Sequence, residues 1–227
     1  GWAGYKHAYT PKICAWVVSE EATRVAGLQT EQYDSANVSD AMLATLENNE
    51  DITLEYEEEG GQVAIVFNKQ SGLCSDVNMR KAINSIVNPE ELLMVSYGSS
   101  YTLNASYMES TQPLWFSDAG SEYYGTMDTD AAAQYLEAAG YNGETLQILA
   151  SSDNGFDKIG GVLEQELEAA GIDCEMTTVD WGTFTEYRTD PDRFDLFISS
   201  YSTTPVPSLR SYFGKDAPGW TNDSGLD

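Results

Sequence analysis

VAIVFNKQSGLCSDVNMRKAINSIVNPEELLMVSY, residues 63–97, is the stretch that decides the fold. It opens with Val63–Phe67, a short apolar run rich in β-branched residues and bounded by glycines on both sides, which is typical of a buried strand. Ser75 or Asp76 then supplies the N-cap of a helix. The apolar residues of this helix recur on one face with a 3.6-residue period, at Met79, Ala82, Ile83 and Ile86.

A second helix is predicted directly after the first. Asn88 is a favoured N-cap residue, Pro89 fits the first helical position, and two acidic residues follow in the first turn. The stretch therefore predicts a strand, a polar loop and two capped helices. It contains no phosphate-binding glycine motif and no metal-ligand spacing.

Strands and helices alternate from Asp128 onward. Asp128 caps a helix that ends at Gly140, and the sequence Leu-Glu-Ala-Ala-Gly recurs at 167–171, which marks a second helix end at Gly171. The predicted order continues with strand Leu146–Ala150, helix Gly155–Ala170, strand Ile172–Val179, a helix from Trp181, and strand Phe194–Ser200. A helix that joins two β segments implies a right-handed parallel crossover, so the fold class is α/β.

The first 62 residues predict a β-α-β-α-β arrangement. Strands or extended segments are expected at Lys12–Val18, Gln32–Val38 and Ile52–Tyr56, with helices capped near Ser19 and Ser39.

The charge of the chain excludes two classes of partner. Lysine and arginine number 11 against 37 aspartates and glutamates, which gives a formal net charge of −26. Binding to nucleic acid or adsorption on anionic lipid needs clustered positive charge, so neither is expected. The acid excess is explained by a self-repelling surface, with a salt-adapted or cation-attracting surface as the alternative. No run approaches the ~18 apolar residues of a membrane span.

The cysteines and the histidine indicate no reactive centre. Cys14, Cys74 and Cys174 are widely spaced and form neither a Cys-x-x-Cys nor a zinc pattern. Each lies in or beside an apolar run, so buried free thiols are expected, with one disulfide as the alternative. His7 is the only histidine, so a two-histidine metal site is excluded and a Ser-His-Asp triad would rest on this one residue. We predict no catalytic residue, metal or cofactor.

Several segments resemble, in the same order, those of the family 5 extracellular solute-binding proteins, which are the oligopeptide, dipeptide and nickel-type receptors of ABC importers. The matching segments are Phe67-Asn68, Asp76 with Met79–Ala82, Asn88–Glu91, Glu21–Arg24, and the helix from Asp128 to Tyr141. The resemblance covers about residues 11–213. The evidence for the resemblance is that these segments follow one another in the same order in this chain and in the family.

The resemblance implies a type II periplasmic-binding-protein-like fold, a mixed sheet with helices on both faces, present here as a partial chain. Residues 1–62 would form a β-α-β-α-β piece of lobe I, and residues 63–227 an α/β piece of the C-terminal lobe II. The implied function is capture of an extracellular solute, such as a peptide, by lobe closure and delivery to the membrane permease of an ABC importer. The full-length protein would be extracellular or periplasmic and membrane-anchored, and the partial chain would expose apolar edges that favour self-association.

The resemblance places the ligand site at the end of the last strand. Family peptide receptors carry an aromatic residue there, which contacts the ligand, and an Asp three positions later, which pairs with the peptide's α-ammonium. Tyr201 stands at the aromatic position, but Thr204 stands at the position of the Asp. A hydroxyl lacks the charge-assisted hydrogen bond of a carboxylate, worth roughly 1.5–3 kcal/mol. Free-amine recognition would therefore need another acid, and a blocked peptide, a sugar or another neutral solute becomes more plausible.

The predicted ligand-binding residues are Ser200, Tyr201, Thr203, Thr204 and Tyr101. Tyr201 would stack on the ligand, and the three hydroxyl side chains would supply hydrogen bonds. Tyr101 belongs to residues 99–125, a Ser-, Tyr- and Asn-rich stretch predicted to form a long loop, and it would line the same cleft. The alternatives are a merely polar strand-end loop and a Tyr101 that anchors its loop on the core.

Two other functions fit the same composition. A secreted hydrolase using paired carboxylates would show turnover and one carboxyl with a raised pKa, although the carboxylates are too many to single out a pair. A non-catalytic surface interaction module would bind a protein partner and no small ligand.

Overall fold

The computed structural model describes residues 9–55, 61–106, 108–110, 112–153 and 155–202. The chain divides into two compact units, residues 1–56 and 57–227, so the whole of the strand that begins at Gly61 lies in the second unit. The sequence placed this boundary six residues later, between 62 and 63. The assignment of the two pieces to lobes stays a prediction.

In its described residues, 9–55, the first unit contains two helices, α1 (Glu21–Gln29) and α2 (Asp40–Leu43). The guanidinium of Arg24 donates to the carbonyl of Val18 at 2.7 Å and to that of Asn37 at 3.0 Å. Arg24 therefore joins the segments that precede and follow α1.

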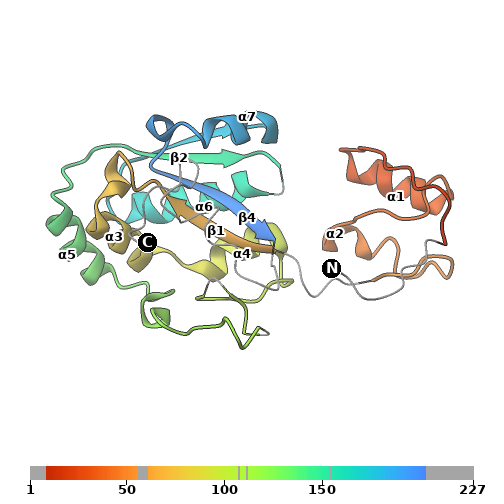
Figure 1. The fold of residues 1–227 in the computed structure, drawn as a ribbon, viewed down its shortest axis with the longest axis horizontal. Coiled ribbons are helices and arrows are strands. Elements are labelled where there is room, and N and C mark those ends of the chain that lie inside the picture. The colour runs from red at the N-terminus through yellow and green to blue at the C-terminus, as the bar shows by residue number, and fades with distance from the viewer. Residues whose placement is uncertain (1–8, 56–60, 107, 111, 154, 203–227) are drawn as a thin grey trace. The chain divides into compact units, whose positions relative to one another are not determined.

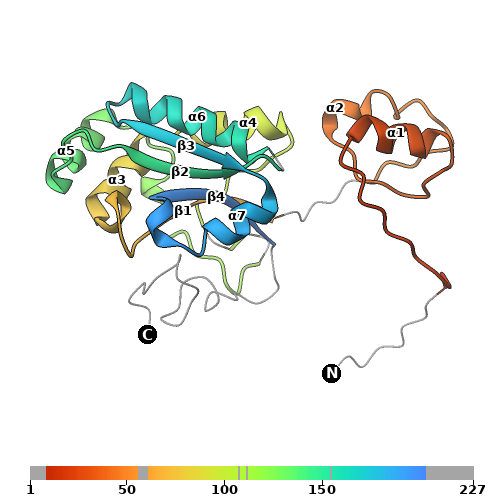
Figure 2. The same cartoon turned by 90° about the horizontal axis from the view of Figure 1, so that it is seen from above.

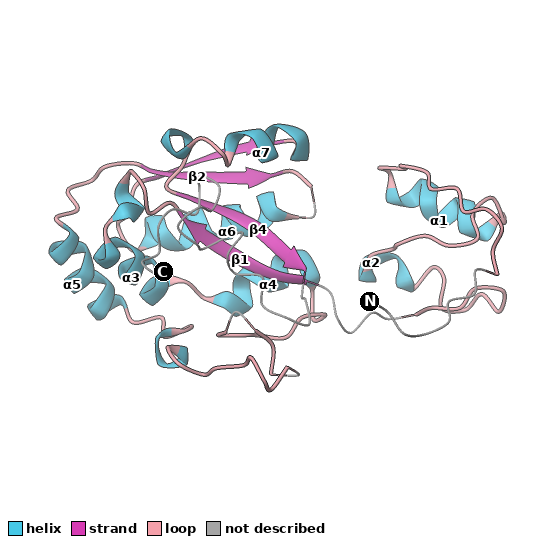
Figure 3. Cartoon of the chain, in the orientation of Figure 1, coloured by secondary structure: helices cyan, strands magenta, loops and turns pink. Residues whose placement is uncertain are grey.

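The strands expected in this unit do not form. Figure 3 shows helices and loops but no arrow in the described part of residues 9–55, where 12–18, 32–38 and 52–55 all lie outside strands. Ile13, Trp16 and Val17 are 85%, 75% and 100% exposed. An apolar run becomes a strand only when another strand pairs with its backbone, and the described residues of this unit offer no such partner.

The described part of the second unit is built on a mixed four-stranded sheet in the order β1-β4-β2-β3. The strands are β1 (Gly61–Phe67), β2 (Leu146–Ser151), β3 (Cys174–Val179) and β4 (Leu196–Ser202). β1 runs antiparallel to β4, whereas β2 runs parallel to both β4 and β3 (Figure 1). The predicted α/β class and the parallel pairing of β2 with β3 are confirmed.

Helices cover both faces of this sheet, as predicted (Figure 2). One face carries α6 (Phe156–Ala169), α3 (Val77–Ile86) and α4 (Pro89–Tyr97), with α5 (Thr129–Ala139) packed on α3. The other face carries α7 (Trp181–Tyr187). Short 3-10 helices lie at Leu73–Ser75, Ser121–Tyr123 and Pro191–Arg193, and the rest of the described part of 99–125 is loop and turn, as expected.

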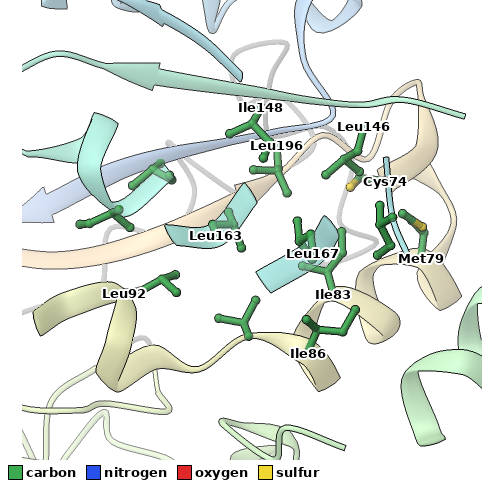
Figure 4. Close-up of a cluster of buried hydrophobic side chains, with 14 of the residues drawn as sticks. Cys74, Met79, Ile83, Ile86, Leu92, Leu146, Ile148, Leu163, Leu167 and Leu196 are labelled. Carbon is green, nitrogen blue, oxygen red and sulfur yellow. The ribbon is translucent and has the colours of Figure 1, made fainter. Parts of the chain in front are cut away.

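The main core lies between the sheet and α6. Leu163 and Leu167 of α6 pack with Leu146, Ile148 and Leu196 of the strands (Figure 4). Residues of α3 and α4 complete this cluster, among them Met79, Ile83, Ile86 and Leu92. A second, smaller cluster lies on the α7 face and contains Val66, Leu149, Phe184, Phe194, Phe197 and Tyr201.

The predicted helix boundaries follow from caps that the structure confirms. Asp76 accepts a hydrogen bond from the backbone of Asn78 at 2.6 Å, and Asp128 accepts one from Ala131 at 2.9 Å. Gly140 ends α5 with φ 71°, a left-handed conformation that glycine adopts without steric cost.

The cysteines fit the prediction only in part. All three are free thiols, so no disulfide forms. Cys74 is fully buried and its pKa is raised, chiefly by burial and then by the charge of Asp195. Cys14 is exposed, contrary to the prediction, because its run has no partner to pack against in the described part of the first unit.

Asp195 fixes the amino end of β4 to its neighbours. One carboxylate oxygen accepts the backbone N–H of Leu73 at 2.5 Å, and the other accepts that of Gln147 at 2.9 Å. This buried side chain therefore joins the start of β4 to β2 and to the turn that follows β1. These bonds help to hold the strands in register, and the register determines which residues lie together at the opposite edge of the sheet.

Candidate functional site

The carboxyl edge of the sheet is the candidate site. β4, β2 and β3 are mutually parallel, so their carboxyl ends meet at one edge, and the arrowheads of β2 and β4 point the same way in Figure 1. Ligands of open α/β sheets bind outside the carboxyl ends of the strands. The predicted residues Ser200 and Tyr201 belong to the last three residues of β4 and therefore lie at this edge.

Ser200 and Tyr201 project from opposite faces of the sheet, because side chains alternate along a strand. Ser200 is exposed. Tyr201 is only 8% exposed and packs in the cluster on the α7 face with Val66 and Phe197. Of the two side chains, the Ser200 hydroxyl is therefore the one that is open to a solute.

The other three predicted residues are not located at the end of β4 by the described part of the structure. Thr203 and Thr204 lie outside the described residues. Tyr101 is half-buried and lines a shallow, open hollow of about 510 Å³ together with Met94, Gly98 and Ser99, all from α4 and the loop after it. The structure thus places Tyr101 against α4, whereas Ser200 and Tyr201 lie on β4.

The loop after α4 nevertheless approaches the carboxyl edge. The side-chain amide of Gln62 donates to the carbonyl of Ser106 at 3.4 Å, and Gln62 is paired with Tyr201 across the β1–β4 ladder. The loop that contains Tyr101 is therefore bonded through Ser106 to the start of β1, which lies beside the end of β4.

Sequence reasoning missed a carboxylate at this edge. Asp153 follows β2 by two residues and is exposed. Its Oδ2 accepts the backbone N–H of Trp181 at 2.8 Å and faces the Ser151 hydroxyl at 3.4 Å, while the Ser151 Oγ accepts the Asp153 backbone N–H at 3.1 Å. The only signal in the sequence was the polar Ser-Ser-Asp directly after a predicted strand.

A second acid at the edge has a structural role. Asp180 caps α7, with its two carboxylate oxygens accepting from the Thr183 hydroxyl at 2.6 Å and the Thr183 backbone at 3.1 Å. These hydrogen bonds, the hydroxyl's first, lower the pKa of Asp180. The carboxylate therefore serves as the N-cap of α7.

The described residues contain no group of three or more His, Cys, Asp or Glu side chains that could hold a metal ion. His7 lies outside them. None of the helices in the described ranges has the length and apolar composition needed to cross a bilayer. The chemistry available at the edge is hydrogen bonding and negative charge.

Comparison with known proteins identifies the family. Residues 2–220 match the family described as bacterial extracellular solute-binding proteins, family 5 middle. The chain belongs to this family. Among its relatives, the probable peptide ABC transporter periplasmic-binding protein y4tO of Sinorhizobium fredii is 26% identical over 222 residues, a match that covers 89% of this chain and 40% of that protein.

Solved structures of family 5 solute-binding proteins share the fold. An ABC transporter substrate-binding protein, CtaP, from Listeria monocytogenes matches with a TM-score of 0.78 at 16% identity, over 91% of this chain and 43% of its own. A dipeptide-binding protein from Pseudoalteromonas sp. SM9913, in complex with Met-Leu, matches with a TM-score of 0.76 at 21% identity and the same coverage. The chain thus spans less than half the length of these relatives, and the predicted type II periplasmic-binding-protein fold is confirmed.

Proposed function

We propose that this chain is part of the substrate-binding component of an ABC importer, which captures an extracellular solute, a peptide or similar small molecule, by closing two lobes. Membership of family 5 over residues 2–220 is the observation that carries the proposal. The relatives named as a peptide transporter's binding protein and as a dipeptide-binding protein support a peptide ligand. The mechanism is a hinge motion that selects the liganded state and requires no covalent chemistry.

The proposed ligand-binding residues of this chain are Ser200, Tyr201, Thr203, Thr204 and Tyr101. The exposed hydroxyl of Ser200 would donate to or accept from the solute at the carboxyl edge. Tyr201 would form the wall beneath the ligand, since its ring is packed at the end of β4, and Tyr101 would approach from the loop after α4. Thr203 and Thr204 continue the chain beyond β4.

The partner of the full-length protein would be the membrane permease of an ABC importer. The family is described as extracellular, and an anchor on the full-length protein would keep the receptor near its permease. The apolar side chains exposed on the first unit, such as Trp16 and Val17, are where this chain alone would associate with itself.

The decisive experiment identifies the solute. The full-length protein is purified from its native compartment, unfolded to release bound molecules, and the released fraction is examined by mass spectrometry. A peptide that rebinds the refolded protein in calorimetry and is recovered unchanged supports the proposal. Cleavage of the bound molecule would favour a hydrolase, and a protein partner with no small ligand would favour an interaction module.

A further inference from the structure

One apolar surface of the second unit lies open in the described residues. All of the large apolar side chains exposed in the described part of this unit, apart from Val77 and Trp181, belong to α4 or to the segment that follows it. We call this group the apolar loop face; its members are Met94, Val95, Leu103, Leu114, Trp115, Phe116, Tyr123, Tyr124 and Met127. We infer that, in the full-length protein, the chain that continues beyond Asp227 docks on the apolar loop face.

The loop that carries this face is held against α4 at both of its ends. Tyr101, near the start of the loop, lines the shallow hollow together with Met94 at the carboxyl end of the helix. Near the end of the loop, Gly125 lies so close to Pro89, the first residue of α4, that an added Cβ would be 3.2 Å from the proline Cγ. Figure 1 shows the loop, coloured yellow-green to green, between α4 and α5. Because both ends of the loop are fixed to one helix, its exposed apolar side chains belong to a supported surface.

The composition of this stretch does not suit a surface that faces only water. Residues 89–127 contain no lysine or arginine, so the stretch has no long basic side chain of its own to cover the apolar atoms. Leu114 is 89% exposed, and Trp115 beside it is 48% exposed. Aromatic residues and methionine are enriched at the buried centre of protein interfaces, where lysine is depleted. Exposed apolar groups gathered in this way therefore indicate an interaction surface.

The length of the relatives indicates which polypeptide docks there. The matches cover 40% of the y4tO protein and 43% of CtaP, so more than half of each relative lies outside the matched part. The family description itself refers to the middle of family 5. A full-length protein of this length supplies a tethered chain, and a tethered segment reaches a surface at a higher effective concentration than a separate molecule does. The inference does not depend on which solute is bound.

The place where the chain leaves the sheet favours the same occupant. β4 ends at Ser202, which pairs with Gly61 of β1. The next residue of β1, Gln62, donates its side-chain amide to the carbonyl of Ser106 in the loop. The chain that follows β4 therefore starts beside the loop that carries the apolar face. A second copy is disfavoured as the occupant, because each chain has a formal net charge of −26 and the two copies would repel each other.

The test uses the full-length protein with Leu114→p-benzoylphenylalanine, a photoreactive residue that cross-links to the polypeptide lying against it. After irradiation, the linked peptides are identified by mass spectrometry. We expect links to peptides that follow Asp227, formed within one molecule. The same replacement at Glu137, an exposed position of α5 outside the apolar loop face, is the control and should give no such links.

Hydroxyl-radical oxidation of the unmodified full-length protein gives a second measurement that needs no variant. Met94 should oxidise about 10-fold more slowly than in the urea-unfolded protein, as the buried Met79 does, and Trp115 should be better protected than Trp181. Support for the inference requires both this protection and the links to the chain beyond Asp227.

Three results overturn the inference. The first is oxidation of Met94 at the unfolded rate. The second is a set of links from position 114 that is confined to residues 1–227, even if Met94 is protected. The third is a link that joins two molecules of the protein or reaches a different protein. None of these results bears on solute capture, which the mass spectrometry of the released solute tests separately.

Discussion

The side-chain amide of Asn68 donates a hydrogen bond to the backbone carbonyl of Phe194 at 2.9 Å, across 126 residues of sequence. The same nitrogen donates to the carbonyl of Pro191 at 2.6 Å, and the Asn68 Oδ1 accepts the N–H of Gln70 at 3.0 Å. Asn68 is completely buried. One amide thus satisfies the backbone of the turn after β1 and of the turn before β4.

Replacing Asn68 with Ala should destabilise the fold strongly. The buried Phe194 carbonyl would lose its donor and the Gln70 N–H its acceptor, whereas the Pro191 carbonyl would keep the Ser71 hydroxyl. Each unsatisfied buried group costs about 1–3 kcal/mol, so a loss of about 2–3 kcal/mol is expected. Urea unfolding of the full-length protein measures it. Asn84→Ala, at an exposed position of α3, is the control and should be neutral or slightly stabilising. Equal unfolding midpoints for the two variants would contradict this role of Asn68.

Gly72→Ala should be destabilising because the position combines two constraints. Gly72 has φ +70°, which an L-residue adopts only with strain, and an added Cβ would collide with the carboxylate of Asp195. We expect a loss of about 2 kcal/mol in unfolding free energy. Gly161→Ala is the matched control, since its Cβ would meet no atom within 4 Å on α6, and it should gain about 0.5–1 kcal/mol. A thermal melt that ranks the two variants in the opposite order would refute the argument.

Glu166→Gln should stabilise the protein near pH 7 and have no effect in acid. Glu166 accepts the Asn88 N–H at 3.0 Å, and burial raises its pKa above the ordinary value of 4.5, with the Asn88 hydrogen bond opposing and the Glu91 charge assisting. The folded state therefore binds the Glu166 proton more tightly than the unfolded state does. The contribution of protonated Glu166 to folding stability is present below about pH 4.5 and is lost as the pH rises through the pKa of the folded state. Glutamine keeps an acceptor for Asn88 and removes the ionisation.

The measurement is the difference in melting temperature between Glu166→Gln and wild type at about pH 4 and about pH 7. Because removing any acid relieves repulsion in a chain of net charge −26, Glu137→Gln at an exposed position of α5 serves as the control. The gain at neutral pH should be larger for Glu166→Gln. Parallel behaviour of the two variants at both pH values would rule out the burial effect.

The sequence predicted the second unit well because its signals are local and its partners are present in the same chain. The cap at Asp128 and the left-handed glycine at Gly140 define α5 regardless of what packs on it. The apolar run of β1 became a strand because β4 pairs with it along its whole length. The run around Trp16 carries an equally clear strand pattern, but the described residues of the first unit provide no strand beside it. Apolar patterning shows that a segment needs a partner and cannot show that the partner is there.

Sequence patterns predicted the part of the candidate site that lies at the end of β4, because a strand end can be read from the apolar run before it. The predicted strand, 194–200, put Ser200 at its last residue and Tyr201 just beyond it. In the structure β4 continues to Ser202, and alternation along it puts the Ser200 and Tyr201 side chains on opposite faces of the sheet, which was not predicted from the sequence. Asp153 was missed because its environment depends on topology. The N–H that holds it belongs to Trp181, 28 residues away, and reaches it only because β2 and β3 are parallel neighbours.

Ser200→Ala tests the proposed binding edge without disturbing the core. The Ser200 side chain is exposed, so its removal should leave the melting temperature unchanged, whereas Tyr201→Ala would also remove a packed ring from the α7-face cluster. The loss of one hydrogen bond to the solute, about 0.5–1.5 kcal/mol, predicts about a 2- to 12-fold weaker Kd. Calorimetry with the co-purified solute measures it in the full-length protein. Thr177→Ala, an exposed hydroxyl in the middle of β3, should leave Kd unchanged. If Ser200→Ala binds as tightly as this control, the solute does not contact the end of β4, and the ligand site must be sought on another part of the protein.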